Sequence, residues 1–176
     1  MAQTAFVHLR TFSAYTILDG AMEPAAIGIA AKERGFPAVA LCDRIGLFAS
    51  MAFDDGCRAQ GVQPITGCFL RVARPGSADP SKPALGEAEA YLSLLQQYFP
   101  GRLYIELSRR EDPVEMAAEA GLIALAMDRG IPLVATNPSC FSEPDFHEAH
   151  DAMKCIAQSA YVENDEREKP SRHLWM

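Results

Sequence analysis

The side chains best able to do chemistry lie in loops that follow short apolar runs. The first of these loops, residues 10–22, carries Asp19, and Asp43 and Cys140 follow later apolar runs in the same way. In α/β proteins, chemistry is usually placed at the carboxyl ends of the strands. These loops are therefore the first place to look for an active site.

The elements that must position these loops alternate between strand and helix. Strands are expected at residues 6–9, 38–42, 64–72, 103–107 and 132–136. Helices are expected at 24–34, 47–60, 87–99, 113–129 and from 143 or 144 to 158. The helix at 47–60 should place Phe48, Met51 and Ala52 on one side. Five strand–helix repeats imply an α/β fold with a parallel sheet and helices outside it.

Composition narrows the class of protein. The chain has 176 residues, 49% of them hydrophobic, and a formal net charge of −7. This acidic total argues against a domain that holds nucleic acid by charge alone. Neither a membrane-spanning run nor a signal-peptide layout is present, so a cytoplasmic protein with no membrane partner is expected. The five cysteines form no C-x-x-C pair and are expected to be free thiols.

Residues 6–21 read Phe-Val-His-Leu-Arg-Thr-Phe-Ser-Ala-Tyr-Thr-Ile-Leu-Asp-Gly-Ala. This phrase resembles the opening of the PHP (polymerase and histidinol phosphatase) domain of bacterial DNA polymerase III alpha subunits, usually F-x-H-L-H-x-H-S-x-Y-S-x-L-D-G-A. The frames Pro-Ala-Val-Ala-Leu-x-Asp at 37–43, Pro-Ile-x-Gly-Cys at 64–68, Ala-Thr-Asn at 135–137 and Ala-His-Asp at 149–151 extend it. The similar blocks are residues 6–72 and 91–163.

The resemblance implies a PHP-type (β/α) barrel with parallel strands. The family has about seven strands and this chain shows five, so a middle segment is missing and the barrel is expected to be truncated, either open or re-closed. Residues 1–163 are expected to form the PHP domain. A Pro/Gly/Ser linker at 74–86 should join the two blocks, and a charged tail at 164–176 should lead to an absent polymerase region.

Active PHP domains hold catalytic metal ions, and the resemblance marks their ligand positions. In this chain those positions carry Arg10, Phe12, Asp19, Asp43, Arg44, Phe69, Pro138 and Cys140. A guanidinium does not deprotonate to bind a cation, and phenylalanine and proline offer no side-chain donor atom. No catalytic residue and no cofactor are therefore expected, and Asp19, Asp43 and Cys140 leave room only for weakly held zinc or manganese.

The two arginines admit two interpretations. Arg10 and Arg44 could form ion pairs with Asp19 and Asp43, so that fixed cations replace the metal ions. Alternatively, both could point into solvent, where ion pairs contribute little.

Other candidate residues favour structural roles. His147 and His150, three residues apart on a helix, could ligate zinc, but exposed helical histidines are far commoner. His8 is expected to be partly buried and hydrogen-bonded, and Ser13 has no visible catalytic triad. The short basic segments at 71–74 and 109–110 are expected to be solvated, with a contact to a partner or to DNA as the alternative.

Three functions remain open. The resemblance implies a non-catalytic domain of a replicative polymerase, which supports the thumb and palm of the alpha chain and offers a docking surface to the proofreading exonuclease. DNA would be reached only through the parent DNA-directed DNA polymerase, a nucleotidyltransferase whose palm aspartates lie outside this chain. The second possibility is a metal-dependent phosphoesterase or 3′–5′ exonuclease. The third is a free-standing PHP-like binding protein.

Overall fold

The computed structural model describes residues 6–44, 46–70, 85–110, 112–164, 166–167 and 169–176. Two compact units make up the chain. Unit 1 consists of Met1–Leu70, Ser108–Asp112 and Thr136–Met176, and unit 2 of Arg71–Leu107 and Pro113–Ala135. The chain leaves unit 1 after Leu70, passes through it again at Ser108–Asp112 and returns to it at Thr136.

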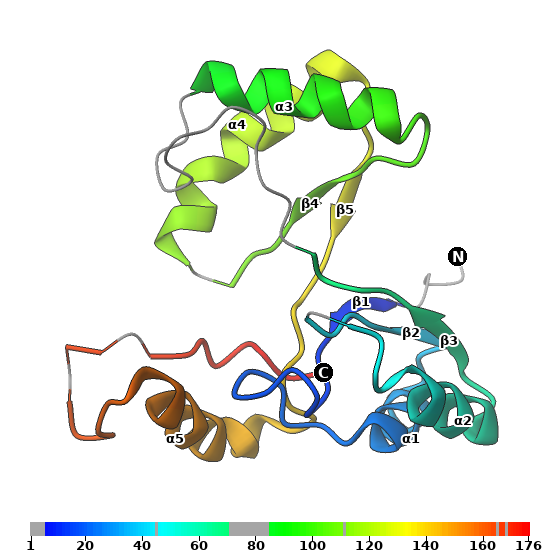
Figure 1. The fold of residues 1–176 in the computed structure, drawn as a ribbon, viewed down its shortest axis with the longest axis vertical. Coiled ribbons are helices and arrows are strands. Elements are labelled where there is room, and N and C mark those ends of the chain that lie inside the picture. Colours follow the sequence, from blue (N-terminus) through cyan, green and yellow to red (C-terminus); the bar gives the residue numbers. More distant parts are fainter. Residues whose placement is uncertain (1–5, 45, 71–84, 111, 165, 168) are drawn as a thin grey trace. The chain divides into compact units, whose positions relative to one another are not determined.

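Unit 1 is built on a parallel three-stranded sheet (Figure 1). Its strands, in the order β1-β2-β3, are β1 (His8–Thr11), β2 (Ala38–Leu41) and β3 (Gln63–Thr66). Helices α1 (Pro24–Glu33) and α2 (Ser50–Gln60) lie side by side against one face of this sheet. All three strands are short, and β2, which lies between the other two, is the most buried.

Close packing of α1 against α2 depends on two glycines. A Cβ atom on Gly28 would lie 2.7 Å from the Cα of Cys57, and one on Gly56 would lie 2.7 Å from the Cα of Ala25. Glycine at both positions lets the two helix backbones approach each other. The buried face of α2 is therefore the one that carries Gly56, Cys57 and the fully buried Phe53.

The expected apolar side of this helix is not buried. Phe48 is 78% exposed and Met51 is 81% exposed, and α2 begins at Ser50, after Phe48. The side of α2 that packs inward is instead the one with the glycine contacts to α1.

The far edge of β1 pairs with the segment that follows strand β5 (Leu133–Ala135). The Phe12 amide donates to the Ser139 carbonyl at 2.9 Å, and the Ser139 amide donates to the Arg10 carbonyl at 2.9 Å. Beyond this segment come the 3-10 turn η1 (Pro144–Phe146) and helix α5 (His147–Gln158). Residues of the first and last thirds of the chain are thus brought to one end of the sheet.

The last residues of the chain return to unit 1. The Cys140 amide donates to the Leu174 carbonyl at 2.7 Å, and the Met176 amide donates to the Phe141 carbonyl at 3.1 Å. Leu174 and Met176 are buried. The end of the segment expected as a charged tail therefore contributes to the core of this unit.

Unit 2 holds the other two strands. Strands β4 (Ile105–Leu107) and β5 (Leu133–Ala135) are parallel neighbours, and helices α3 (Leu85–Tyr98) and α4 (Pro113–Arg129) complete the unit. Its core consists of Leu92, Ile105, Ala126 and Ile131.

The α/β class with parallel strands is confirmed, and within the described residues the five strands form two separate sheets. Most of the expected linker at 74–86 and the basic segment at 71–74 fall outside the described residues, while residues 85–86 already belong to α3. None of the described helices has both the length and the apolarity needed to cross a membrane.

Candidate functional site

Asp43 ties the loop at 10–22 to the end of β2. Its carboxylate accepts hydrogen bonds from the Ser13 amide at 2.7 Å, the Ser13 hydroxyl at 2.6 Å and the Thr16 hydroxyl at 2.7 Å. The Thr16 hydroxyl in turn accepts a hydrogen bond from the Arg44 amide at 3.1 Å. Asp43 is 2% exposed. A buried carboxylate with three donors is a structural clamp, because most of its lone pairs are occupied.

The turn at Leu18–Gly20 closes this loop on itself. The amides of Asp19 and Gly20 both donate to the Thr16 carbonyl, at 3.0 and 2.9 Å. Leu18 has a φ of 66°, an uncommon conformation for a residue with a side chain. A Cβ on Gly20 would lie 2.1 Å from the Ser13 carbonyl oxygen, so only glycine fits there. The Leu-Asp-Gly sequence thus fixes where Asp19 points.

Asp19 receives two cations from different elements. Its carboxylate lies 3.1 Å from Nε of Arg44 and 2.5 Å from Nζ of Lys154 on α5. The expected pairing of Arg44 with Asp19 is confirmed, and solvent exposure as the alternative for Arg44 is wrong. The donors described for Asp43 are hydroxyl and amide groups.

Lys154 was not singled out by the sequence. His150, one helical turn before it, hydrogen-bonds through Nε2 to the Asp19 carbonyl at 2.8 Å. Residues four apart lie on the same face of a helix. The four-residue spacing from His150, in the Ala-His-Asp frame, was therefore the sequence signal that could have identified Lys154.

Two arginines and two phenylalanines form a stacked cluster at the expected ligand positions. The guanidinium carbon of Arg10 lies 5.8 Å from the Phe12 ring centre and 5.1 Å from that of Phe69. The corresponding distances for Arg44 are 5.4 and 4.9 Å. The two rings meet edge to face, with centres 6.4 Å apart. Both cations thus lie within the range of cation–π attraction; we call these four residues, with Asp19 and Lys154, the arginine–phenylalanine cluster.

Cys140 borders this cluster as a neutral thiol. Burial, together with the Asp19 carboxylate, raises the pKa of the Cys140 thiol to about 12. The nearby cations of Lys154, Arg44 and Arg10 lower the pKa of this thiol, but only partly offset its rise. The thiolate is the form that binds metals, so at neutral pH Cys140 is poorly suited to be a ligand.

These residues do not fit a catalytic metal cluster. The structure brings together six of the eight positions marked by the family resemblance, but as cations, rings and a neutral thiol around one carboxylate. Asp43 faces its own hydrogen-bond donors, and Pro138 has no donor atom. In the described part of the chain, no three His, Cys, Asp or Glu side chains are grouped to hold an ion.

The histidines serve as hydrogen-bonding groups in and around the core. His8 is buried and its Nδ1 lies 2.9 Å from the Ser139 hydroxyl, which confirms the expectation of a hydrogen-bonded histidine. His147 bonds through Nε2 to the Pro170 carbonyl at 3.1 Å. His150 is 1% exposed, so its expected exposure is wrong. Burial lowers the pKa of both His8 and His150.

A buried ion pair attaches the end of the chain to α5. Arg167 donates to both carboxylate oxygens of Asp151, one of them at 2.6 Å from Nη1. These bonds hold the pKa of Asp151 below its ordinary value. The aspartate of the Ala-His-Asp frame is therefore engaged in structure.

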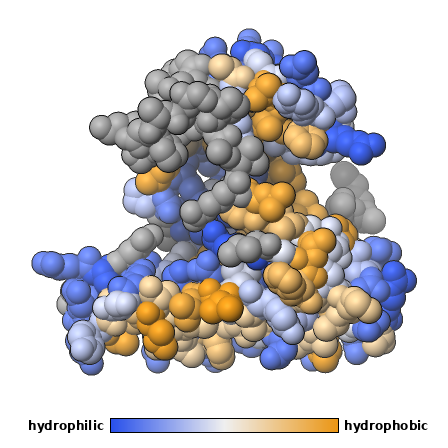
Figure 2. Space-filling model, in the orientation of Figure 1, coloured by the Kyte–Doolittle hydropathy of each residue, from blue (hydrophilic) through white to orange (hydrophobic). Residues whose placement is uncertain are grey.

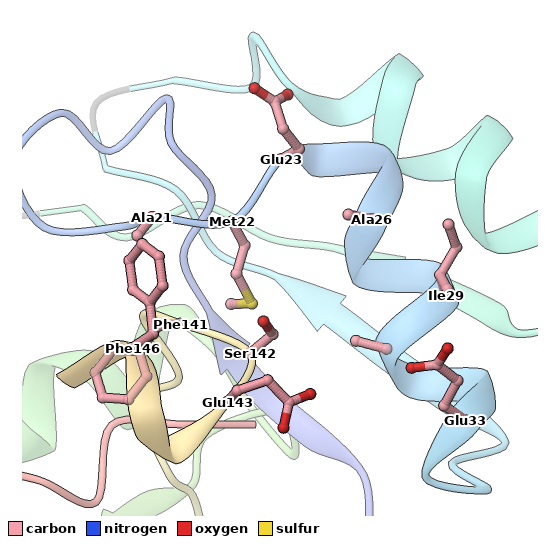
Figure 3. Close-up of a pocket in the computed structure, with 11 residues that line it drawn as sticks. Ala21, Met22, Glu23, Ala26, Ile29, Glu33, Phe141, Ser142, Glu143 and Phe146 are labelled. Carbon is pink, nitrogen blue, oxygen red and sulfur yellow. The ribbon is translucent and has the colours of Figure 1, made fainter. Parts of the chain in front are cut away.

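Surface hollows are also found among the described residues of unit 1. One, of about 480 Å³, is lined by Ala14, Tyr15, Thr16, Ile17, Arg44 and Phe48. The other, of about 330 Å³, lies between α1 and residues 141–146 (Figure 3).

Comparisons with known proteins identify the family of this chain. The PHP domain family matches residues 8–158. Proteins named DNA polymerase III subunit alpha are similar to the chain. The one from Caulobacter vibrioides is 31% identical over 238 residues, covering 97% of this chain and 21% of that protein. The one from Rickettsia bellii is 26% identical over 234 residues, which cover 98% of this chain and 20% of that protein. The one from Treponema pallidum is 37% identical over 95 residues, which cover 54% of this chain and 8% of that protein.

The chain thus spans about a fifth of the length of the first two relatives. Because 238 aligned positions exceed the 176 residues of the chain, the Caulobacter protein has residues where this chain has none. An alignment of this kind is what a missing middle segment requires.

Proposed function

This chain belongs to the PHP domain family, and we propose that it is the non-catalytic PHP domain of a replicative DNA polymerase III alpha subunit. The support comes from relatives of that name, two of which align with nearly the whole chain. In this proposal the polymerase reaction belongs to the longer parent chain. The present region supports the thumb and palm, and DNA is reached through them.

The observation that carries the non-catalytic role is the arginine–phenylalanine cluster. Its guanidinium groups stack on Phe12 and Phe69 at positions where the family resemblance places metal ligands. A divalent cation brought among Arg10, Arg44 and Lys154 would be repelled by all three, and Asp19 is already paired with two of them. Fixed side-chain charges therefore take the place of ions and connect β1, β2 and α5.

A docking role is supported by the surface of unit 1. Large apolar side chains there are exposed, and Figure 2 shows hydrophobic areas on the face drawn. They include Tyr15, Ile17, Leu47, Phe48, Met51 and Leu70. Exposed apolar patches of this kind often mark sites of protein–protein contact. We assign this surface to contacts with the rest of the polymerase and with its proofreading exonuclease.

A metal-dependent phosphoesterase or 3′–5′ exonuclease is the second candidate, favoured by the retained Asp19 and Asp43. Metal content and hydrolysis distinguish the two functions. The purified chain, incubated with zinc or manganese and then desalted, should hold far less than one ion per molecule. It should not hydrolyse a phosphomonoester or single-stranded DNA above the buffer rate.

The matched variant is Asp19→Asn, which should show the same background as the wild type. One ion per chain, together with turnover that both a chelator and Asp19→Asn abolish, would establish the phosphoesterase instead.

Docking is tested by titrating the exonuclease subunit from the same organism into the 176-residue chain in a calorimeter. Saturable binding that weakens in Phe48→Ser, but not in the exposed control Glu148→Gln, is expected. Absence of heat and of co-elution on a sizing column would contradict the docking role.

A further inference from the structure

The smaller hollow of unit 1 is lined by both apolar and acidic side chains. Its floor is apolar and includes the buried side chains of Met22 and Phe141, and it is flanked by Ile29 on α1 and Phe146 on η1 (Figure 3). Ile29 is 46% exposed and Phe146 is 44% exposed. A ligand in this hollow would cover apolar surface of both side chains, and removing apolar surface from water is favourable.

The sequence of α1 explains why the hollow exists. Glu23, Ala26, Ala30 and Glu33 recur at intervals of three and four residues, so they share one face of the helix. The two alanines in the middle leave the space that larger side chains would fill. The volume of about 330 Å³ lies at the lower end of the range for binding pockets.

Acidic side chains surround this apolar space. Glu23 and Glu33 lie at the two ends of the α1 face, and Glu143 lies on the opposite side (Figure 3). Glu143 is already paired with Arg34, at 2.5 Å. Among the described residues, no cation is paired with Glu23 or Glu33, and both are exposed. The rim thus offers two carboxylates with no partner of their own.

From this geometry we propose that the groove binds a basic peptide segment of a partner protein. One apolar side chain of the peptide enters the hollow between Ala26 and Phe146, and lysine or arginine side chains on either side of it pair with Glu23 and Glu33. Phosphate-rich partners such as nucleic acid or anionic lipid are disfavoured, because the rim carboxylates would repel them.

The distance between the two glutamates sets the spacing of the basic residues. Ten residues of helix span about 15 Å. An extended peptide covers that length in about four to five residues, at roughly 3.3 Å each. Its alternate side chains face the same way. The expected pattern is therefore two basic residues about four positions apart with an apolar residue midway between them.

This groove deepens the proposed docking role and rests on it, but it can be tested without the exonuclease. A library of short random peptides is selected for binding to the immobilised 176-residue chain. Selected peptides should carry an apolar residue flanked by lysine or arginine. Their affinity should fall as salt is added, because exposed charge pairs are screened.

Two groove variants then test the site. Ala26→Trp fills the hollow from an exposed position and should weaken binding by about tenfold or more, as expected when about 1.4 kcal/mol of apolar contact is lost. Glu23→Gln combined with Glu33→Gln should weaken it several-fold and flatten the salt dependence. Matched controls outside the groove are Ala59→Trp and the pair Asp55→Asn with Glu148→Gln, which should bind like the wild type.

Failure to select any peptide, selection without basic residues, or equal binding to Ala26→Trp would each overturn the proposal. If the exonuclease binds the wild type while the peptide selection fails, the groove is wrong and the docking role stands. If the peptides behave as expected but the exonuclease does not bind, the groove stands and docking of the exonuclease is wrong.

Discussion

Replacing Asp43 by alanine should destabilise unit 1 more than any substitution on its surface. The change removes one buried carboxylate and leaves three donors without an acceptor: the Ser13 amide and the hydroxyls of Ser13 and Thr16. A hydrogen bond to a charged group contributes roughly 1.5–3 kcal/mol. Part of that gain is offset in the wild type by the cost of burying the charge, so the expected loss is about 3–5 kcal/mol.

The assay is urea unfolding followed by the fluorescence of Trp175, the only tryptophan of the chain, which lies in unit 1. With a slope of about 2 kcal/mol per M, the loss corresponds to a midpoint lowered by roughly 2 M. Asp43→Asn keeps one carbonyl acceptor and should lose about 2 kcal/mol. The exposed control Asp55→Asn should change the free energy of unfolding by less than about 0.5 kcal/mol.

This experiment also separates a clamp from a metal ligand. If Asp43 held an ion in the wild type, a chelator would lower the unfolding midpoint, because metal binding contributes to folding free energy. We expect no effect of chelator. A loss below about 1 kcal/mol in Asp43→Ala, typical of a solvated surface residue, would refute the reasoning.

Three further predictions concern other parts of the structure. Arg44→Ala removes the ion pair between Arg44 and Asp19 and two contacts with aromatic rings. It should lower the melting temperature by a few degrees, at about 2–4 °C for each kcal/mol of stability lost. An unchanged melting temperature by calorimetry would count against a structural role for Arg44. Gly56→Ala should lower the free energy of unfolding by about 1–3 kcal/mol, because the new Cβ overlaps Ala25. The control Gly121→Ala in α4, where a Cβ meets open space, should raise it by up to about 1 kcal/mol. A gain in denaturant resistance for both variants would contradict the close helix packing. Burial lowers the pKa of His150 from 6.5, so the unfolded chain binds more protons than the folded one. The free energy of unfolding should therefore fall as the pH drops below about 6.5. Unfolding curves at neutral and mildly acidic pH should show a smaller fall for His150→Gln than for the wild type, and an equal fall would argue against this assignment.

The alternation of strands and helices was predictable because each element carries its own local signals. Pro24 opens α1 and Gly61 follows the end of α2 in the left-handed conformation. The buried face of α2 was not predictable in the same way. Phe48 and Met51 are apolar but exposed, while the glycine contact at Gly56 decides which side meets α1, and that contact involves a helix earlier in the chain.

The sequence by itself determined which atoms the ligand positions can offer. Arginine and phenylalanine at positions 10, 12, 44 and 69 offer no lone-pair donor atom to a metal ion in any fold, because covalent structure sets their chemistry. Only the tertiary structure decided which groups those residues meet. Asp43 bonds to hydroxyls from a loop 27 to 30 residues away, and Lys154 reaches Asp19 across 135 residues. Such partners depend on how the strands and helices pack together, which no local stretch of sequence encodes.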